Sequence, residues 1–155
     1  MKKLIKKYWP LLTAFIIGSI INAHYFIPSW SFDGYCNLCD TFEVYALHFI
    51  KAGRYFSALI YFIVDLLKID YSVFSTISII FSLLFLSCGV YVIHKDLINL
   101  VKKNKITAVI IFIGAFLICF NPFNAEFFVF EEGFAMSLGI LLSILSASIF
   151  FKQET

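Results

Sequence analysis

Residues 72–94 read SVFSTISIIFSLLFLSCGVYVIH and contain no lysine, arginine, aspartate or glutamate. An α-helix rises about 1.5 Å per residue, so this stretch can cross a hydrocarbon core roughly 30 Å thick. Three more apolar runs lie at about 10–29, 105–122 and 133–151. The sequence therefore predicts an all-α, polytopic membrane protein with four transmembrane helices, and residues 1–155 form a single membrane domain.

The overall composition supports a membrane protein. Hydrophobic residues make up 61% of the chain and charged residues only 14%, against roughly 25% charged in soluble domains. The net charge of +2 comes from basic residues that flank the apolar runs. Because no polybasic stripe is left over, the sequence predicts no nucleic-acid partner.

The basic residues are divided unequally between the two sides that four spans create. With the N-terminus inside, nine face the cytoplasm and three face out, whereas the acids divide eight outside and two inside. An excess of lysine and arginine on the cytoplasmic side sets the orientation of membrane proteins. We therefore expect an integral inner-membrane (plasma-membrane) protein of a bacterium, with both termini in the cytoplasm. The three outer basic residues are Lys51, Arg54 and Lys68.

One further apolar run, GRYFSALIYFIVDLL at 53–67, determines the number of spans. Fifteen residues reach only about 22 Å as a helix. If they crossed, five basic residues would lie inside and seven outside, which breaks the bias. Its polar residues fall within an arc of about 80°. These are Arg54, Ser57, Tyr61, Asp65 and Lys68.

Such a stripe is typical of a helix at the outer interface, or of a helix at a bundle edge whose stripe faces a cavity. The preceding stretch is similar, since Glu43, His48 and Lys51 share one side. The first outer loop is therefore predicted to hold two amphipathic juxtamembrane helices, about 41–52 and 53–68, broken at Gly53.

Small residues recur at a spacing of four in two of the predicted spans, where they let helices approach closely. We expect tight packing within the chain, with a dimer interface as the alternative. The residues are Ser78 and Ser82 near Gly89, and Ala135, Gly139, Ser143 and Ala147.

Four short motifs follow one another along the predicted outer face. They are Phe32-Asp33-Gly34-Tyr35, Gly53-Arg54-Tyr55-Phe56, Asn121-Pro122-Phe123, and Glu132 four residues before Met136. Their order resembles the N-terminal part of the polytopic O-antigen glucosyltransferases and related glucosyltransferase domains of the type-C glycosyltransferase superfamily. The resemblance covers nearly the whole chain, although members of that family are several hundred residues long and have more spans.

The resemblance implies that Asp33 is the catalytic carboxylate. Sugar transfer from a lipid phosphate needs a carboxylate to take the acceptor proton, and cations to stabilise the departing phosphate. Arg54 suits bidentate phosphate binding, and Lys51 and Lys68 are further substrate-binding candidates. Glu132 is the second catalytic candidate, either orienting the sugar or holding a divalent cation together with Asp33. The sequence supports no other cofactor.

Two functions follow from these observations. The first is a membrane glycosyltransferase, or a truncated or split N-terminal part of one, that moves a sugar (glucose, by the resemblance) from a polyprenyl-phosphate carrier to a surface glycan. A second polypeptide would then supply the remaining spans. The alternative, which the chain length favours, is a small four-span accessory or structural protein without catalytic activity.

The cysteines and histidines form no recognisable site in the sequence. Cys36 and Cys39 make a lone C-x-x-C in the outer loop, either as a local disulfide or as two free thiols. The histidines, His24, His48 and His94, are scattered, and we expect them at the membrane interface as amphipathic side chains.

Overall fold

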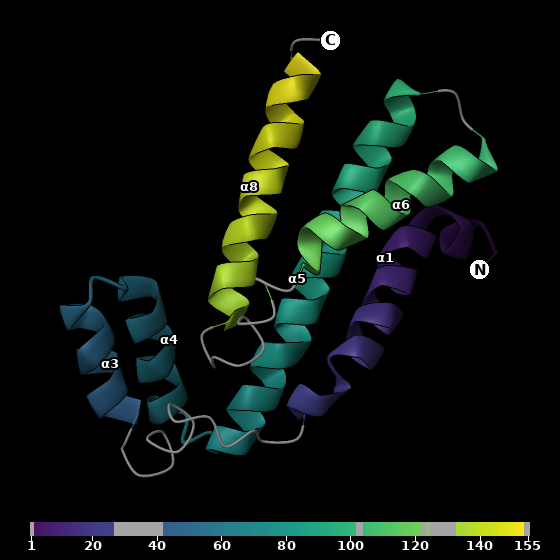
Figure 1. Cartoon of the computed structure of the whole chain (residues 1–155). Coiled ribbons are helices and arrows are strands. Elements are labelled where there is room, and N and C mark those ends of the chain that lie inside the picture. The colour runs from purple at the N-terminus through teal and green to yellow at the C-terminus, as the bar shows by residue number, and fades with distance from the viewer. Residues whose placement is uncertain (1, 27–41, 102–103, 122–123, 125–132, 154–155) are drawn as a thin grey trace.

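The computed structural model describes residues 2–26, 42–101, 104–121, 124 and 133–153, and these residues form helices and short connections without a strand (Figure 1). The all-α prediction is confirmed. In chain order the elements are α1 (Lys2–Ile21), the short 3-10 helix η1 (Ala23–Phe26), α3 (Phe42–Lys51), α4 (Tyr55–Leu66), α5 (Tyr71–Leu100), α6 (Lys105–Cys119) and α8 (Gly133–Gln153).

Helix α5 is the longest element, with 30 residues, and α1, α6 and α8 pack against it. Helix α8 runs parallel to α5, because the Phe74 and Phe134 rings lie 6.4 Å apart near the start of both helices. Helix α1 runs antiparallel to α5, because Tyr8 near its start lies 5.4 Å from the Tyr91 ring. The α3–α4 pair lies at the end of the molecule where α5 begins, and the C-terminus lies at the opposite end (Figure 1).

Two helices are long and apolar enough to cross a membrane, judged by length and composition: α5 over Ser72–Leu100, and α8. Helix α6 has 15 residues, and the described apolar part of α1 covers Lys7–Ile21. The limit of about 22 Å that excluded 53–67 as a span applies equally to these two helices. Four spans therefore stay a prediction.

The boundaries of the helices differ from those of the predicted spans. Helix α1 ends at Ile21 rather than near residue 29, and α6 ends at Cys119 rather than at 122. Helix α5 continues to Leu100, six residues past the predicted end, because residues 95–100 (KDLINL) contain no glycine or proline to stop it. Hydropathy marks where apolar residues stop, and a helix can continue beyond that point.

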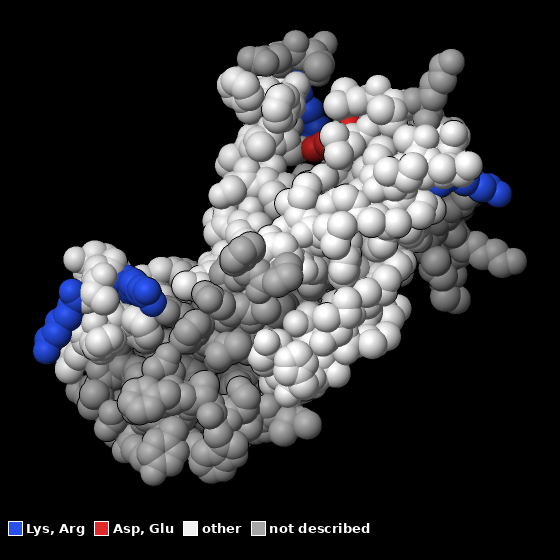
Figure 2. Space-filling model, in the orientation of Figure 1, with Lys and Arg blue, Asp and Glu red and all other residues white. Residues whose placement is uncertain are grey.

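The surface of the described part of the chain is divided by charge. In the view of Figure 2, lysines and arginines lie over the α3–α4 pair, and basic and acidic residues lie near the far ends of α5 and α8 and the start of α6, with uncharged surface between. Exposed large hydrophobic residues occur along every helix, for example Ile20, Ile80, Ile113 and Phe150. This distribution fits a bundle surrounded by lipid.

The interior between α1, α5 and α6 is a cluster of mostly aliphatic and small residues with one buried aromatic ring, Phe112, and is here called the bundle cluster. Two glycines allow close approach. A Cβ on Gly18 would lie 2.6 Å from the Phe120 ring, and a Cβ on Gly89 would lie 3.2 Å from the Cys119 sulfur. The buried members are Ala14, Ile79, Leu83, Leu86, Val90, Phe112, Ala115 and Cys119.

The predicted small-residue stripes behave differently in α5 and α8. Ser78 and Ser82 of α5 are buried, as expected for close packing. In α8 the prediction of packing within the chain is wrong, since Gly139 and Ser143 are exposed and a Cβ on Gly139 would meet nothing within 4 Å. Helix α8 turns Ser137 toward α5 instead, and Gly139 lies about 200° further round the helix.

A second interior region joins the α3–α4 pair to α5 and is here called the hairpin cluster. Its buried members are Ala46, Tyr61, Val64 and Phe74. The ring of Tyr61 lies 5.1 Å from that of Phe49 on α3 and 5.4 Å from that of Phe74 on α5. The aromatic rings therefore hold the pair against the rest of the bundle.

Only the middle of the polar stripe of α4 points inward, since Ser57 and Tyr61 are buried while Asp65 and Lys68 are exposed. Tyr61 is 1% exposed and Ser57 is also buried, whereas Leu59 and Ile63 are 54% and 43% exposed. The buried middle of the stripe agrees with the bundle-edge alternative, and its exposed ends agree with the interface alternative, so both stay predictions. Arg54, at one end of the stripe, is exposed.

Candidate functional site

The turn between α3 and α4 positions the Gly-Arg-aromatic-aromatic motif. The Gly53 amide donates to the Ile50 carbonyl (3.1 Å), and the Arg54 amide donates to the Phe49 carbonyl (2.8 Å). With Gly53 at φ 76°, these two bonds form a Schellman motif, which ends a helix at a residue in the left-handed region. The helices therefore separate at Gly53 as predicted, and Arg54 leads directly into α4.

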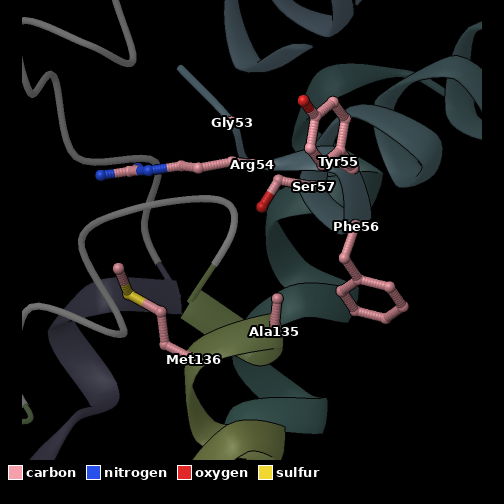
Figure 3. Close-up of a pocket in the computed structure, with 7 residues that line it drawn as sticks. All are labelled: Gly53, Arg54, Tyr55, Phe56, Ser57, Ala135 and Met136. Atoms are coloured by element: carbon pink, nitrogen blue, oxygen red, sulfur yellow. The ribbon is translucent and has the colours of Figure 1, made fainter. Parts of the chain in front are cut away.

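A pocket of about 460 Å³, here called the Arg54 pocket, lies where this turn faces the start of α8. It is lined by Gly53, Arg54, Tyr55, Phe56 and Ser57, together with Ala135 and Met136 of α8. Figure 3 shows the Arg54 and Met136 side chains extending to the same side, while Phe56 points the other way. The structure thus brings together two motifs that are about 80 residues apart in the sequence.

The lining of the Arg54 pocket can bind an anion. Arg54 is exposed, and its guanidinium offers a planar fork of donors that matches phosphate oxygens. Tyr55 and Ser57 add hydroxyl groups to the lining. Among the described residues of the lining there is no carboxylate, so a general base for sugar transfer would have to come from elsewhere in the chain.

Both predicted catalytic acids, Asp33 and Glu132, lie outside the described residues, as do Cys36 and Cys39. Glu132 directly precedes Gly133, the first residue of α8. Within the described ranges, no three histidine, cysteine or acidic residues are grouped to hold a metal ion. The predicted cation between Asp33 and Glu132 stays a prediction.

The two other predicted phosphate ligands do not line the Arg54 pocket. Lys51 is the last residue of α3. Lys68 lies beyond the far end of α4, a helix of 12 residues and thus about 18 Å long. There Lys68 adopts φ 51° in a second Schellman motif, in which the Ile69 amide donates to the Val64 carbonyl (3.1 Å). Lys68 therefore lies at the end of α4 opposite the Arg54 pocket.

Asn121 of the Asn-Pro motif caps the C-terminus of α6. Its side-chain amide donates to the Ile118 carbonyl (2.9 Å), and its side-chain oxygen accepts from the Asn124 amide (3.0 Å). The Asn124 side chain donates to the Cys119 carbonyl (2.8 Å). These bonds satisfy carbonyls that have no partner within the helix. Asn124 was missed in the sequence, although a second asparagine three residues after the first is the signal for such a cap.

His94 differs from the prediction of an interfacial side chain. It is 6% exposed, and its ring lies edge-on to Trp9 with ring centroids 5.2 Å apart. Among the residues that the structure describes, its Nε2 atom has no hydrogen-bond partner. The burial follows from the packing of Trp9 of α1 against the His94 ring. His24 and His48 are exposed.

Comparisons with protein-family models, with curated proteins and with solved structures give no match to this chain. The resemblance to the glucosyltransferases therefore stays a prediction that rests on the sequence motifs.

Proposed function

We propose that this chain carries the outer-face part of a membrane glycosyltransferase and binds the phosphate of a polyprenyl-phosphate sugar at Arg54. The observation that supports the proposal is the Arg54 pocket, in which the Gly53–Ser57 segment meets Met136 of α8. Both segments belong to motifs on which the resemblance rests. The pocket is lined by Arg54, an exposed residue, and has about 460 Å³ of space.

In the proposed reaction, a hydroxyl oxygen of the surface glycan attacks the anomeric carbon of the donor sugar. The bond from that carbon to the phosphate oxygen breaks, and the electron pair leaves with the polyprenyl phosphate. Asp33 accepts the hydroxyl proton, while Arg54 stabilises the charge on the departing phosphate. Glu132 orients the sugar or shares a divalent cation with Asp33. A second polypeptide with further spans is a proposed partner.

Two substitutions test this assignment, in membranes that contain the chain and any polypeptide encoded beside it. Asp33→Asn should lower turnover by roughly 100-fold or more and leave donor binding intact, since only the general base is lost. Arg54→Ala should weaken donor binding by roughly 10–100-fold. Lys105→Ala, at the opposite end of the molecule, is the control. Glycosylation at the control level by both variants would refute the site.

The proposed topology has its own test. Reporter fusions after Asp40 and after Asn124 should report an extracytoplasmic location, and a fusion after Lys103 should report a cytoplasmic one. An external signal at Lys103 would mean that residues 53–67 cross the membrane. The Arg54 pocket would then not be accessible from the outer face in the proposed manner.

One observation favours a second candidate, a non-catalytic protein that binds an anionic lipid. Among the described residues, the lining of the Arg54 pocket contains a cation and no carboxylate. Such a protein would bind polyprenyl phosphate through Arg54 and would transfer no sugar. Donor binding that depends on Arg54, with turnover absent in every combination of partners, would establish this alternative.

A further inference from the structure

A cleft of about 310 Å³, here called the terminal cleft, lies between the last turns of α5 and α8. It is at the end of the molecule where the C-terminus lies, opposite the α3–α4 pair (Figure 1). Figure 2 shows acidic and basic surface side by side between the two helix ends. Because α5 and α8 run parallel, the C-terminal ends of both helices border the cleft.

The polar part of the terminal cleft carries a cation and an anion together. The Lys152 ammonium lies 3.1 Å from Oδ1 of Asp96 and donates to the hydroxyl of buried Ser148 at 2.7 Å. The side chains of Lys152 and Asp96 are 58% and 25% exposed, so a ligand can reach both. An ammonium has three donors and a carboxylate has two oxygens, so a ligand can add a hydrogen bond to each.

Apolar side chains also line the terminal cleft. They are Leu97 and Leu100 of α5 and Phe151 of α8, all of them exposed. The predicted spans end at about residues 94 and 151, so Asp96 and Lys152 lie just past the hydrocarbon core. In the predicted topology, this is the depth of the headgroups of the cytoplasmic leaflet. The cleft therefore matches an amphiphile, with its polar head at the ion pair and its hydrocarbon against the apolar side chains.

The charges around the terminal cleft restrict the headgroup. Lys152 favours a phosphate, with which an ammonium makes charge-assisted hydrogen bonds. Asp96 disfavours a headgroup that carries only negative charge and favours an ammonium. The helix ends add to this preference, because the last carbonyls of α5 and α8 carry partial negative charge. A headgroup with a phosphate and an ammonium a few atoms apart satisfies both side chains.

We propose that the terminal cleft binds a phospholipid of the cytoplasmic leaflet through a phosphoethanolamine headgroup. The phosphate accepts from Lys152, and the primary ammonium donates to Asp96. The cleft volume of about 310 Å³ is near the lower end of ligand pockets, roughly 300–1,000 Å³, so it holds a headgroup and leaves the acyl chains in the bilayer. The inference is independent of the proposed sugar transfer and needs only that α5 and α8 cross the membrane.

The test compares three phospholipids with the same acyl chains: phosphatidylethanolamine, phosphatidylcholine and phosphatidylglycerol. The choline nitrogen carries no hydrogen to donate, and the glycerol headgroup has no ammonium. Native mass spectrometry of the full chain in detergent, with equal amounts of the three lipids, measures which is bound. The wild type should prefer phosphatidylethanolamine about tenfold, the difference made by roughly one hydrogen bond to a charged group.

Variants of the ion pair locate this preference in the terminal cleft. Asp96→Asn should reduce it to about twofold or less, because a neutral amide is a weaker acceptor of an ammonium donor. Asp96→Glu, which keeps the carboxylate, should retain most of it. Lys152→Gln should weaken the binding of all three lipids about 5–10-fold, since each loses a phosphate contact.

Two matched controls remove the same charges elsewhere. Asp65→Asn removes an exposed carboxylate from α4, at the opposite end of the molecule, and Lys95→Gln removes an exposed lysine that precedes Asp96 and does not line the cleft. Both should bind the three lipids as the wild type does. Thermal unfolding shows whether each variant is folded. If Asp96→Asn does not fold, the comparison of Lys152→Gln with Lys95→Gln tests the phosphate contact.

Four results would overturn the inference. The first is equal binding of the three lipids by the wild type, and the second is an unchanged preference in Asp96→Asn. The third is a preference lost equally in Asp65→Asn, which would assign it to the net charge of the protein. The fourth is displacement of the lipid by water-soluble O-phosphoethanolamine at the same concentration as by the lipid itself, which would show that the cleft binds a free headgroup.

Discussion

The bundle cluster and the hairpin cluster are built in different ways. In the bundle cluster, aliphatic side chains and glycines bring α1, α5 and α6 together over many positions, including Gly18 and Gly89. In the hairpin cluster, Tyr61 contacts rings on both neighbouring helices and is the largest buried side chain. The bundle therefore distributes its packing over many residues, whereas the position of α4, and with it the Arg54 pocket, depends mainly on one.

The largest effect should come from removing that ring. Tyr61→Ala should destabilise the protein by about 3–5 kcal/mol and abolish phosphate binding at Arg54, because α4 loses its contacts with α3 and α5. Tyr61→Phe keeps the ring and should recover most of both. Unfolding in detergent and lipid binding measure the two effects.

Leu83→Ala is the corresponding change in the bundle cluster. Leu83 is fully buried, so the variant should lose about 2–5 kcal/mol of stability. Under conditions where it is folded, it should still bind phosphate. If Leu83→Ala lost binding while Tyr61→Ala kept it, the proposed difference between the two regions would be wrong.

Substitution by alanine should have smaller effects on stability at two glycines of the bundle, and the two effects should differ in sign. Gly18→Ala places a methyl group against the Phe120 ring, which stacks on Phe116 with centroids 4.6 Å apart, and should cost about 1–3 kcal/mol. Gly114→Ala meets nothing within 4 Å and should stabilise α6 by up to about 1 kcal/mol. Equal effects in thermal unfolding would show that close approach at Gly18 does not matter.

The two Schellman turns of the hairpin region predict changes of opposite sign. Gly53→Ala forces a Cβ into the left-handed region and should destabilise by about 1 kcal/mol. Lys68→Gly removes the same strain at the other end of α4 and should stabilise by up to about 1 kcal/mol. Loss of phosphate binding in a stable Lys68→Gly protein would instead support Lys68 as a ligand.

The smallest effect concerns an ion pair at the end of α5 and α8 opposite the hairpin. Lys152 lies 3.1 Å from Asp96 and 2.7 Å from the Ser148 hydroxyl. Because the lysine is exposed, Asp96→Asn should cost only about 0.2–1 kcal/mol, and the loss should shrink in high salt. A loss above this range, independent of salt, would show that the pair contributes more than a surface interaction.

Much of the fold followed from the sequence. Hydropathy predicted the helices, and the glycine at position 53 predicted the break between α3 and α4. The sequence did not predict whether a polar stripe faces the interior or the surroundings. Periodicity placed Ser57 and Tyr61 on one side of α4, but it could not show that this side points inward, since a lipid-facing helix has no need to hide its apolar residues. The prediction that the α8 stripe with Gly139 packs within the chain was wrong for the same reason.

The sequence predicted the candidate site only in part. The sequence singled out Arg54 and Met136 as parts of two separate motifs, but it did not predict that both would line one pocket. Nothing in the sequence indicates that Lys68 would adopt a left-handed conformation or that the start of α4 would face the start of α8. Such features depend on how α3, α4 and α8 meet, and residues far apart in the chain carry no local signal of that meeting.

The capped end of α6 has a consequence for the membrane itself. In the proposed topology, α6 offers about 22 Å of helix beside α5, whose apolar part is about 34 Å long. A bilayer cannot match both lengths, so it must be thinner on the α6 side, at a fraction of a kcal/mol per Å of mismatch. Asn121 and Asn124 make this tolerable, because they satisfy carbonyls that would otherwise lie unpaired near the lipid tails. The protein should therefore distort its bilayer asymmetrically and partition toward thinner regions of a membrane of mixed thickness.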